Sequence, residues 1–177
     1  MEQQLASERK MIATLNLFLE SEKKKIVKKI LVLTEPLLTD EDYNVRIVGR
    51  EIIFDLSKAT GIDTMIHVMR LNIDSTNEYI RNATARSFSI IASALGIPAM
   101  LPFLEKVCFN MESWEARHTG VMIVYHIIVL IGSTSLLPYL SYLLEIIEPR
   151  LKDNNQKVRD ITTVTMDGLA KAATLWY

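Results

Sequence analysis

The 177 residues carry 20 basic and 21 acidic side chains, for a net charge of −1, and 49% of them are hydrophobic. That length suffices for one domain with a sizeable core, and the hydrophobic fraction excludes a disordered chain. The balanced charge argues neither for nor against a nucleic-acid partner, because only a local patch would bind one. The single cysteine, Cys108, excludes an intramolecular disulfide and is typical of a reducing compartment.

Targeting and membrane segments are not indicated. The first ten residues contain no apolar stretch of the signal-peptide kind. The longest apolar run, 121–131, is interrupted by His126 and is shorter than the ~20 residues that a membrane span needs. We therefore expect no membrane partner.

Two amphipathic helices are predicted at the start of the chain. The first covers 8–20 and places apolar residues on one face: Met11, Ile12, Leu15, Phe18 and Leu19. Ser21 is expected to cap the second, whose core face carries Ile26, Val27, Ile30 and Leu31. Five lysines within 23–29 crowd its start, which indicates either a solvated face or contact with an anionic partner. Pro36 is expected to kink its last turn.

A pattern centred on arginine occurs four times along the rest of the chain. Arg46, Arg81, Arg117 and Arg159 each follow an apolar residue, and their spacings are 35, 36 and 42 residues. Four residues before each stands an N-capping type: Asp42, Asn77, Ser113 and Asn155. Fifteen residues after the first three stand Gly61, Gly96 and Gly132, where a left-handed residue is expected to end the helix.

A period of this length with two helices per unit is typical of an α-solenoid of the HEAT or armadillo kind. We predict an all-α, right-handed α-solenoid, with a partial repeat at 1–38, repeats at about 39–71, 72–108 and 109–152, and a half repeat at 153–177. The partner helix in the third repeat is expected to be long, over 135–151. The half repeat is expected to leave Met166 and Leu169 without a partner helix, which suggests part of a longer array.

No catalytic constellation is found in the sequence. The three histidines, His67, His118 and His126, lack metal-site spacing, and there is no glycine-rich phosphate loop or nucleophile elbow. The acidic run 40–42 is typical of a helix start and lacks the pattern of a calcium loop. We predict no enzyme activity, cofactor, metal or small-molecule substrate. A hidden active site would require at least two titratable groups converging in a cleft.

The four arginines have a structural and a functional interpretation. In the first, each guanidinium bonds a carboxylate or a loop carbonyl of a neighbour and forms a ladder along the stack. In the second, the helix starts form an edge that offers cations to a phosphate backbone. Both hold together if different donors of one guanidinium serve each. The residues beside the arginines differ between repeats, so we expect those positions to recognise a partner.

The segments DEDYNVRIVGREI, NEYIRNATARSFSIIASALGIP, ARHTG and NNQKVR resemble the HEAT-repeat domain of the splicing factor 3b subunit 1 family, the large scaffold of the U2 snRNP. The resemblance is collinear from about residue 30 to 174, and only the first 25 or so residues diverge. It implies a nuclear, non-catalytic scaffold that helps to hold the pre-mRNA intron near the branch site, together with other splicing factor 3b subunits and splicing proteins.

The resemblance also implies where this contact occurs. Family positions at the intron groove match Glu78, Tyr79, Arg81, Asn82, His118, Thr119 and Lys157, and the recurring pattern adds Arg117 and Arg159. Met122 stands where the family typically has lysine, four residues after the histidine of ARHTG, which removes a cation from the proposed path. The alternative is a generic HEAT scaffold of the transport or phosphatase type, which has no RNA role and predicts no RNA crosslink at Tyr79 or Lys157.

Overall fold

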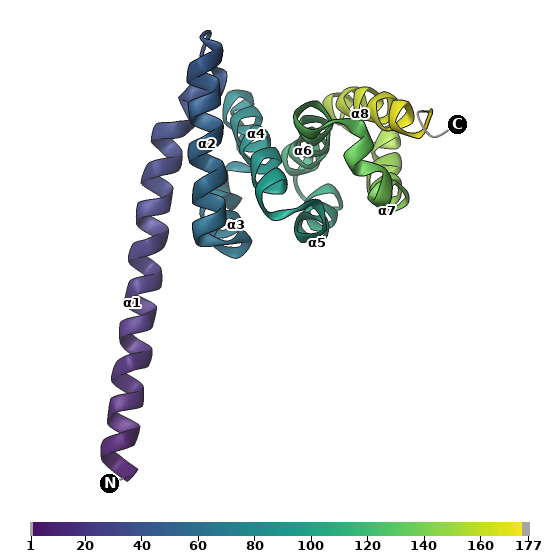
Figure 1. Ribbon diagram of the computed structural model, residues 1–177. Helices are drawn as coiled ribbons and strands as arrows, with labels where there is room; N and C mark the ends of the chain where they lie inside the picture. The colour runs from purple at the N-terminus through teal and green to yellow at the C-terminus, as the bar shows by residue number, and fades with distance from the viewer. Residues whose placement is uncertain (1, 175–177) are drawn as a thin grey trace.

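A stack of helical hairpins with a projecting first helix makes up the computed structural model, which describes residues 2–174 (Figure 1). Within that range there are eight α-helices, four short 3-10 helices and no strand. The elements are α1 (Glu2–Thr34), η1 (Glu35–Thr39), α2 (Tyr43–Thr60), α3 (Ile62–Met69), η2 (Arg70–Asn72), α4 (Glu78–Leu95), α5 (Ile97–Cys108), α6 (Trp114–Ile131), η3 (Ser133–Tyr139), α7 (Leu140–Ile147), η4 (Glu148–Lys152) and α8 (Gln156–Thr174).

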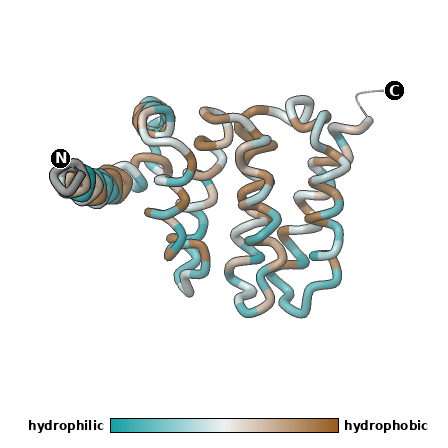
Figure 2. Tube along the Cα trace, turned by 90° about the horizontal axis from the view of Figure 1, so that it is seen from below, coloured by the Kyte–Doolittle hydropathy of each residue, from teal (hydrophilic) through white to brown (hydrophobic). Residues whose placement is uncertain are grey.

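The four arginine-bearing helices pack side by side in sequence order. Helix α2 contacts α4, α4 contacts α6, and α6 contacts α8, while α3, α5 and α7 form the second layer. Figure 2 shows α1 nearly end-on beside this row. The core runs through the row, and Ile53, Phe88 and Val124, each seven residues after its arginine, are fully buried. The all-α solenoid of HEAT repeats is confirmed, whereas the repeat boundaries stay a prediction, and residues 1 and 175–177 lie outside the described chain.

The N-caps and the terminating glycines predicted for these helices are present. The four capping side chains accept a backbone N–H of the first turn: Asp42 from Asn44, Asn77 from Tyr79, Ser113 from Ala116 and Asn155 from Lys157, at 2.7–3.0 Å. The three glycines have positive φ, as expected, and Gly96 has φ 92° and ψ 146°. Its ψ is extended rather than left-handed helical, because the residue turns the chain directly into α5.

The predicted break at Ser21 is wrong, because α1 is one continuous helix of 33 residues. No proline or glycine interrupts it, and an ion pair three residues apart, Glu20 with Lys23, joins the two predicted halves. As a result, the apolar face expected to pack into a repeat is exposed from Met11 to Leu19. The expected kink at Pro36 takes the form of η1, which begins at Glu35.

Two predictions for the C-terminal half also need correction. The long partner helix expected over 135–151 is divided into η3, α7 and η4, with Pro138 inside η3 and Pro149 in the first turn of η4. Leu169 is fully buried and Met166 packs against the core, so α8 covers these side chains by lying on α6.

Candidate RNA- and partner-facing edge

The starts of α4, α6 and α8 lie at one edge of the solenoid because neighbouring arginine-bearing helices pack side by side with the same direction. We call this the helix-start edge. It comprises the nine residues predicted to face RNA or a partner: Glu78, Tyr79, Arg81, Asn82, Arg117, His118, Thr119, Lys157 and Arg159. They divide into an outer set that is at least partly exposed and an inner set that is buried.

The repeated arginines bond the loop in front of their own helices. One guanidinium nitrogen of Arg81 lies 2.6 Å from the carbonyl oxygen of Ser75 and 3.1 Å from that of Thr76. Arg46 and Arg159 make the same pair of bonds to carbonyls six and five residues before them, at 2.6–3.1 Å. Arg117 reaches Asn110, seven residues before it, at 3.0 Å. The recurrence of arginine therefore has a structural cause, since each one fixes the entry to its helix.

Arg117 adds an ion pair that joins the start of α6 to Asp153, in the loop before α8, and Arg150 lies 3.6 Å from the same carboxylate. The Nε and Nη2 of Arg117 donate to the two carboxylate oxygens of Asp153, at 2.6 and 2.9 Å. The two side chains are 12% and 2% exposed. The hydrogen bond from Arg117 lowers the pKa of Asp153, and the same bond raises the pKa of Arg117. The predicted arginine ladder is therefore present at one step of the stack, between α6 and the loop before α8.

Arg81 does not face solvent, contrary to the prediction. Its exposed fraction is 1%, because Trp114 from α6 lies over the guanidinium, with 5.2 Å between the guanidinium carbon and the ring centroid. The side chain is therefore held between two repeats and is unavailable to a ligand at the surface.

His118 and Thr119 are buried as well, so the prediction that they face a partner is wrong for their side chains. The Thr119 hydroxyl lies 2.7 Å from the carbonyl oxygen of Ile73, in the loop before α4, which ties α6 to the preceding repeat. Burial, assisted by the positive charge of Arg81, lowers the pKa of His118 to about 4. His118 is neutral near pH 7 and contributes no cation to the edge.

The most exposed residues of the outer set are Glu78, Tyr79 and Lys157. Lys157 Nζ lies 2.6 Å from a carboxylate oxygen of Glu78, so an ion pair links the starts of α8 and α4 across the start of α6. Both side chains are more than half exposed, and the lysine lowers the pKa of Glu78. Tyr79 is 55% exposed, and its hydroxyl lies 3.3 Å from that of Thr39 in η1. Asn82, Arg117 and Arg159 are partly exposed.

Met122, the departure from the family pattern, is 5% exposed and belongs to the hydrophobic core. Its position on α6 is thus part of the helix packing in this chain.

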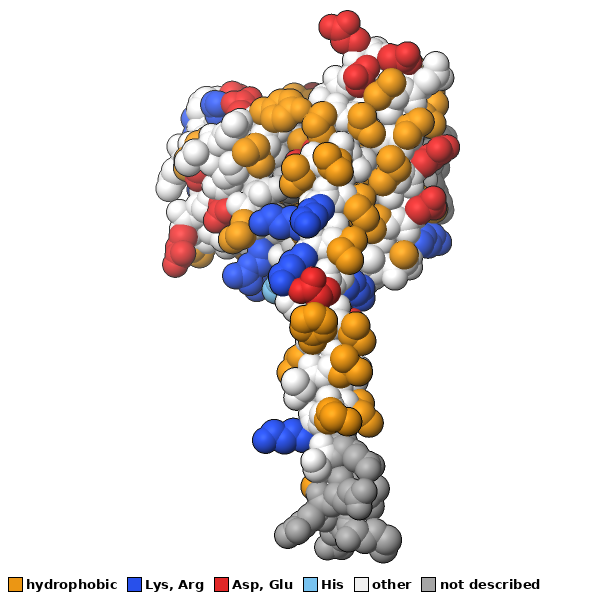
Figure 3. Space-filling model, turned by 90° about the vertical axis from the view of Figure 1, so that its left-hand side faces the viewer, with side chains coloured by type: hydrophobic (Ala, Val, Ile, Leu, Met, Phe, Trp, Pro, Cys, Tyr) orange, Lys and Arg blue, Asp and Glu red, His pale blue; other side chains and the backbone are white. Residues whose placement is uncertain are grey.

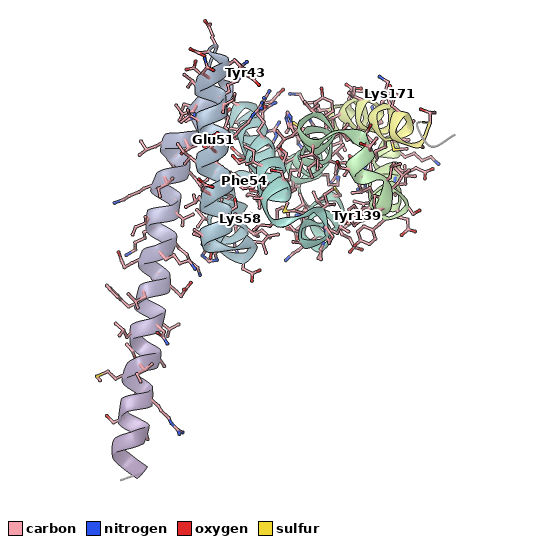
Figure 4. All side chains as sticks on the ribbon, viewed as in Figure 1. Tyr43, Glu51, Phe54, Lys58, Tyr139 and Lys171 are labelled. Atoms are coloured by element: carbon pink, nitrogen blue, oxygen red, sulfur yellow. The ribbon has the colours of Figure 1, made fainter. Side chains whose placement is uncertain are left out.

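A shallow hollow on the side of α2, α4 and α6 was missed by the sequence interpretation. Arg50, Glu51, Phe54 and Asp55 of α2 face Ile90 and Ser93 of α4 and Leu130 of α6 across about 390 Å³. Figure 4 shows Glu51, Phe54 and Lys58 following one another along α2. The available sequence signal was the charged side chains at 50, 51 and 55 beside Phe54, which a solvated helix face also explains.

Residues 2–174 contain neither a metal-site cluster nor a membrane-spanning helix. No group of three or more histidine, cysteine, aspartate or glutamate side chains there is arranged to hold a metal ion. No helix in the described chain combines the length and apolar character needed to cross a bilayer. Cys108 is buried, and burial raises the pKa of its thiol to about 12.

Comparison with known proteins shows that the chain is similar to components of the U2 snRNP. The chain is 55% identical over 146 residues to the U2 snRNP component prp10 of Schizosaccharomyces pombe, which is 82% of this chain and 12% of the relative. It is 43% identical over 148 residues to the U2 snRNP component HSH155 of Saccharomyces cerevisiae, which is 84% of this chain and 15% of the relative. No protein-family model matches the chain. These relatives confirm the resemblance to splicing factor 3b subunit 1, over a small part of its length.

Proposed function

We propose that this chain is a non-catalytic scaffold segment of the splicing factor 3b complex, because it matches two U2 snRNP components over more than four fifths of its own length. In this proposal it acts in the nucleus by binding, and its helix-start edge helps to hold the pre-mRNA intron and neighbouring splicing proteins during branch-site recognition. Other splicing factor 3b subunits are its partners.

The exposed ion pair between Lys157 and Glu78 is the observation that carries the RNA part of the proposal. An exposed pair of this kind contributes only about 0–1 kcal/mol, so a phosphate can replace Glu78 as the partner of Lys157 at little cost. Tyr79, the residue after Glu78 on α4, offers an exposed ring on which a base can stack. The buried arginine bonds keep the helix starts rigid, so these groups are held in place before a ligand arrives.

Binding of single-stranded intron RNA by this chain alone should be weak and should fall with salt, because few cations are available to displace counterions. Lys157 is shared with Glu78, and the acidic Asp160 lies one helical turn along α8. The proposal therefore assigns the edge a positioning role within a larger assembly.

A charge-swap experiment tests the edge. Lys157→Glu should alter branch-site choice by U2 particles that carry the variant, while the chain melts within error of the parent, because an ordinary surface substitution costs within about 0.5 kcal/mol. The double variant Glu78→Lys/Lys157→Glu restores an ion pair with reversed polarity, and branch-site choice should stay altered. Lys171→Glu, near the other end of the same helix (Figure 4), is the matched control and should have no effect.

Three outcomes would count against the proposal. If Lys157→Glu unfolds the chain, Lys157 has a structural role. If the double variant restores normal branch-site choice, the ion pair itself determines that choice, and the Lys157 cation does not bind RNA. If Lys157→Glu leaves branch-site choice unchanged, the helix-start edge does not recognise intron RNA.

A protein-only HEAT scaffold is the alternative, and the burial of Arg81 together with the neutral His118 favours it, because both reduce the positive charge available at the edge. Photo-crosslinking from positions 79 and 157 in splicing extract separates the two. Crosslinks to intron RNA support the proposal, and crosslinks to protein alone support the alternative.

A further inference from the structure

Most of α1 projects from the solenoid as a stalk (Figure 1). Its contacts with α2, α3 and η1 involve the C-terminal part, where Val27, Leu31 and Thr34 are buried. At a rise of 1.5 Å per residue the helix is about 50 Å long. From residue 9 to residue 21, every residue whose side chain the structure describes is exposed.

Exposed apolar side chains recur every seven residues along one side of α1. One series is Ile12, Leu19, Ile26 and Leu33, and the adjacent series is Met11, Phe18 and Val32, with Lys25 at its remaining position. The seven apolar side chains are 53–76% exposed. We call them the heptad stripe; Figure 3 shows apolar side chains following one another along the stalk toward the solenoid. The helix surface between the two series carries Leu15, Glu22 and Lys29, so the stripe lacks the alternating three- and four-residue apolar spacing of a coiled-coil seam, and charged groups interrupt it beyond residue 19. Its exposed apolar side chains still form an amphipathic face of the kind against which a second helix packs.

The heptad stripe is separate from the face of α1 that the solenoid uses. Val27 and Leu31, which pack on the solenoid, fall between stripe positions, at one and five residues after Ile26. At 100° per residue these positions point away from the stripe on the helix surface. Packing of α1 against its own chain therefore leaves the stripe uncovered.

Positive charge flanks the stripe near the solenoid. Residues 2–34 carry seven basic and four acidic side chains, a net charge of +3. Lys25, Lys28 and Lys29 line a shallow hollow together with Val32 and Leu33 of the stripe. Lys25 is paired with Glu22, whereas Lys28 and Lys29 have no ion pair among the described residues. A partner helix that covers the stripe here would meet two uncompensated cations.

We propose that the heptad stripe is the binding site for an acidic amphipathic helix of another protein, which packs alongside α1. The apolar side chains supply the burial, and Lys28 and Lys29 select carboxylates on the partner helix. A second copy of the chain fits less well. A parallel copy sets the two lysine clusters against each other, and an antiparallel copy centred on the stripe sets Lys28 and Lys29 against Asn16 and Leu15, which carry no charge.

A synthetic helix of about four heptads, with Ile and Leu on its core positions and Glu on both flanks, is the probe. Its affinity for the whole chain is measured by fluorescence anisotropy at low and high salt. We expect saturable binding that weakens with salt, and much weaker binding of a twin peptide with Lys at every Glu position. Leu19→Lys should weaken binding by at least about tenfold, since the burial of one leucine side chain is lost.

Matched variants isolate the stripe from the rest of the helix. Leu17→Lys makes the same substitution at an apolar side chain of α1 that is 74% exposed, against 53% for Leu19, and lies off the stripe, so it should leave the affinity unchanged. Lys28→Glu should weaken binding of the acidic peptide and improve binding of its basic twin. Far-UV circular dichroism checks that each variant stays folded.

Four results would overturn the proposal. The first two are equal binding of both peptides and no binding of either peptide. The third is a dimer in sedimentation that Leu19→Lys dissociates, which would assign the stripe to a second copy of the chain. The fourth is binding to phosphatidylserine-containing vesicles in place of the acidic peptide, which would assign the stripe to a lipid surface.

Discussion

Two ion pairs link the arginine-bearing helices, and their burial predicts very different contributions to stability. The Arg117–Asp153 pair is bidentate and almost completely buried, with side chains 12% and 2% exposed. The Lys157–Glu78 pair has one 2.6 Å contact between side chains that are 54% and 62% exposed. Removing one partner of a buried pair costs about 3–5 kcal/mol, because the other charge is left unpaired, whereas an exposed pair contributes about 0–1 kcal/mol.

Double-mutant cycles measure this difference. Arg117→Ala and Asp153→Ala are each expected to lower the unfolding free energy by about 3 kcal/mol, near the low end for buried pairs because Arg117 keeps some contact with water. The coupling energy of the pair should then be about 2 kcal/mol. Lys157→Ala and Glu78→Ala should each cost within about 0.5 kcal/mol, with a coupling energy of similar size.

The assay is urea denaturation of all six single and double variants and the parent, followed by far-UV circular dichroism. A coupling energy below about 1 kcal/mol for Arg117–Asp153, or one no larger than that of Lys157–Glu78, would refute the reasoning. It would mean that the bidentate contact does not hold consecutive repeats together. Raising the salt concentration should reduce the coupling of the exposed pair and leave that of the buried pair almost unchanged.

Three further predictions concern the same framework and use the same denaturation assay. Gly96→Val should lower the unfolding free energy by about 1–3 kcal/mol, because φ 92° with ψ 146° is a conformation that only glycine adopts readily; a variant as stable as the parent would contradict this turn geometry. Gly120→Ala should destabilise by about 1–3 kcal/mol, because its new Cβ would lie 2.7 Å from a sulfur and 3.2 Å from a backbone nitrogen of α5. Gly168→Ala, whose Cβ would meet only a flexible isoleucine side chain at 3.1 Å, should cost less, and equal losses would refute the comparison. His118 and His126 both have pKa values lowered by burial to about 4, so the unfolded chain binds more protons below its histidine pKa of about 6.5. Stability should therefore be fully present above pH 6.5 and fall between about pH 6.5 and 4, by up to about 1.4 kcal/mol per pH unit for each histidine, and His126→Gln should make that slope shallower.

The features that the sequence predicts well are those decided within a few residues. The capping side chains at Asn77 and Ser113 bond N–H groups two or three positions away, so spacing alone locates the helix starts. The positive φ of Gly96 follows from its place between a periodic segment and a proline. The buried side of each helix follows from its 3.6-residue period, as Phe88 and Val124 show.

The features that the sequence misses depend on how separate elements pack. Arg81 stands at a helix start, where a solvated side chain is expected, yet Trp114 of the next repeat covers it. The ion pair of Lys157 with Glu78 joins residues far apart in the chain and requires the edges of three helices to converge. Ser21 is a good capping residue in a sequence without proline or glycine that also favours an uninterrupted helix, and the Glu20–Lys23 ion pair spans it within one helix.

The helix-start edge therefore has an inner layer that fixes geometry and an outer layer that is open to change. Arg81 and Thr119 bond backbone carbonyls in the loops before α4, so their loss would disturb the entry to a helix and the contact between repeats. Glu78, Tyr79 and Lys157 contact mainly one another, η1 and solvent, so their loss leaves the stack intact. Substitutions in the outer layer can alter what the edge binds at constant stability, whereas substitutions in the inner layer change stability and binding together. A defect in RNA or partner binding is thus evidence for direct contact only when it arises in the outer layer, and the same defect at Arg81 or Thr119 reports a displaced helix start.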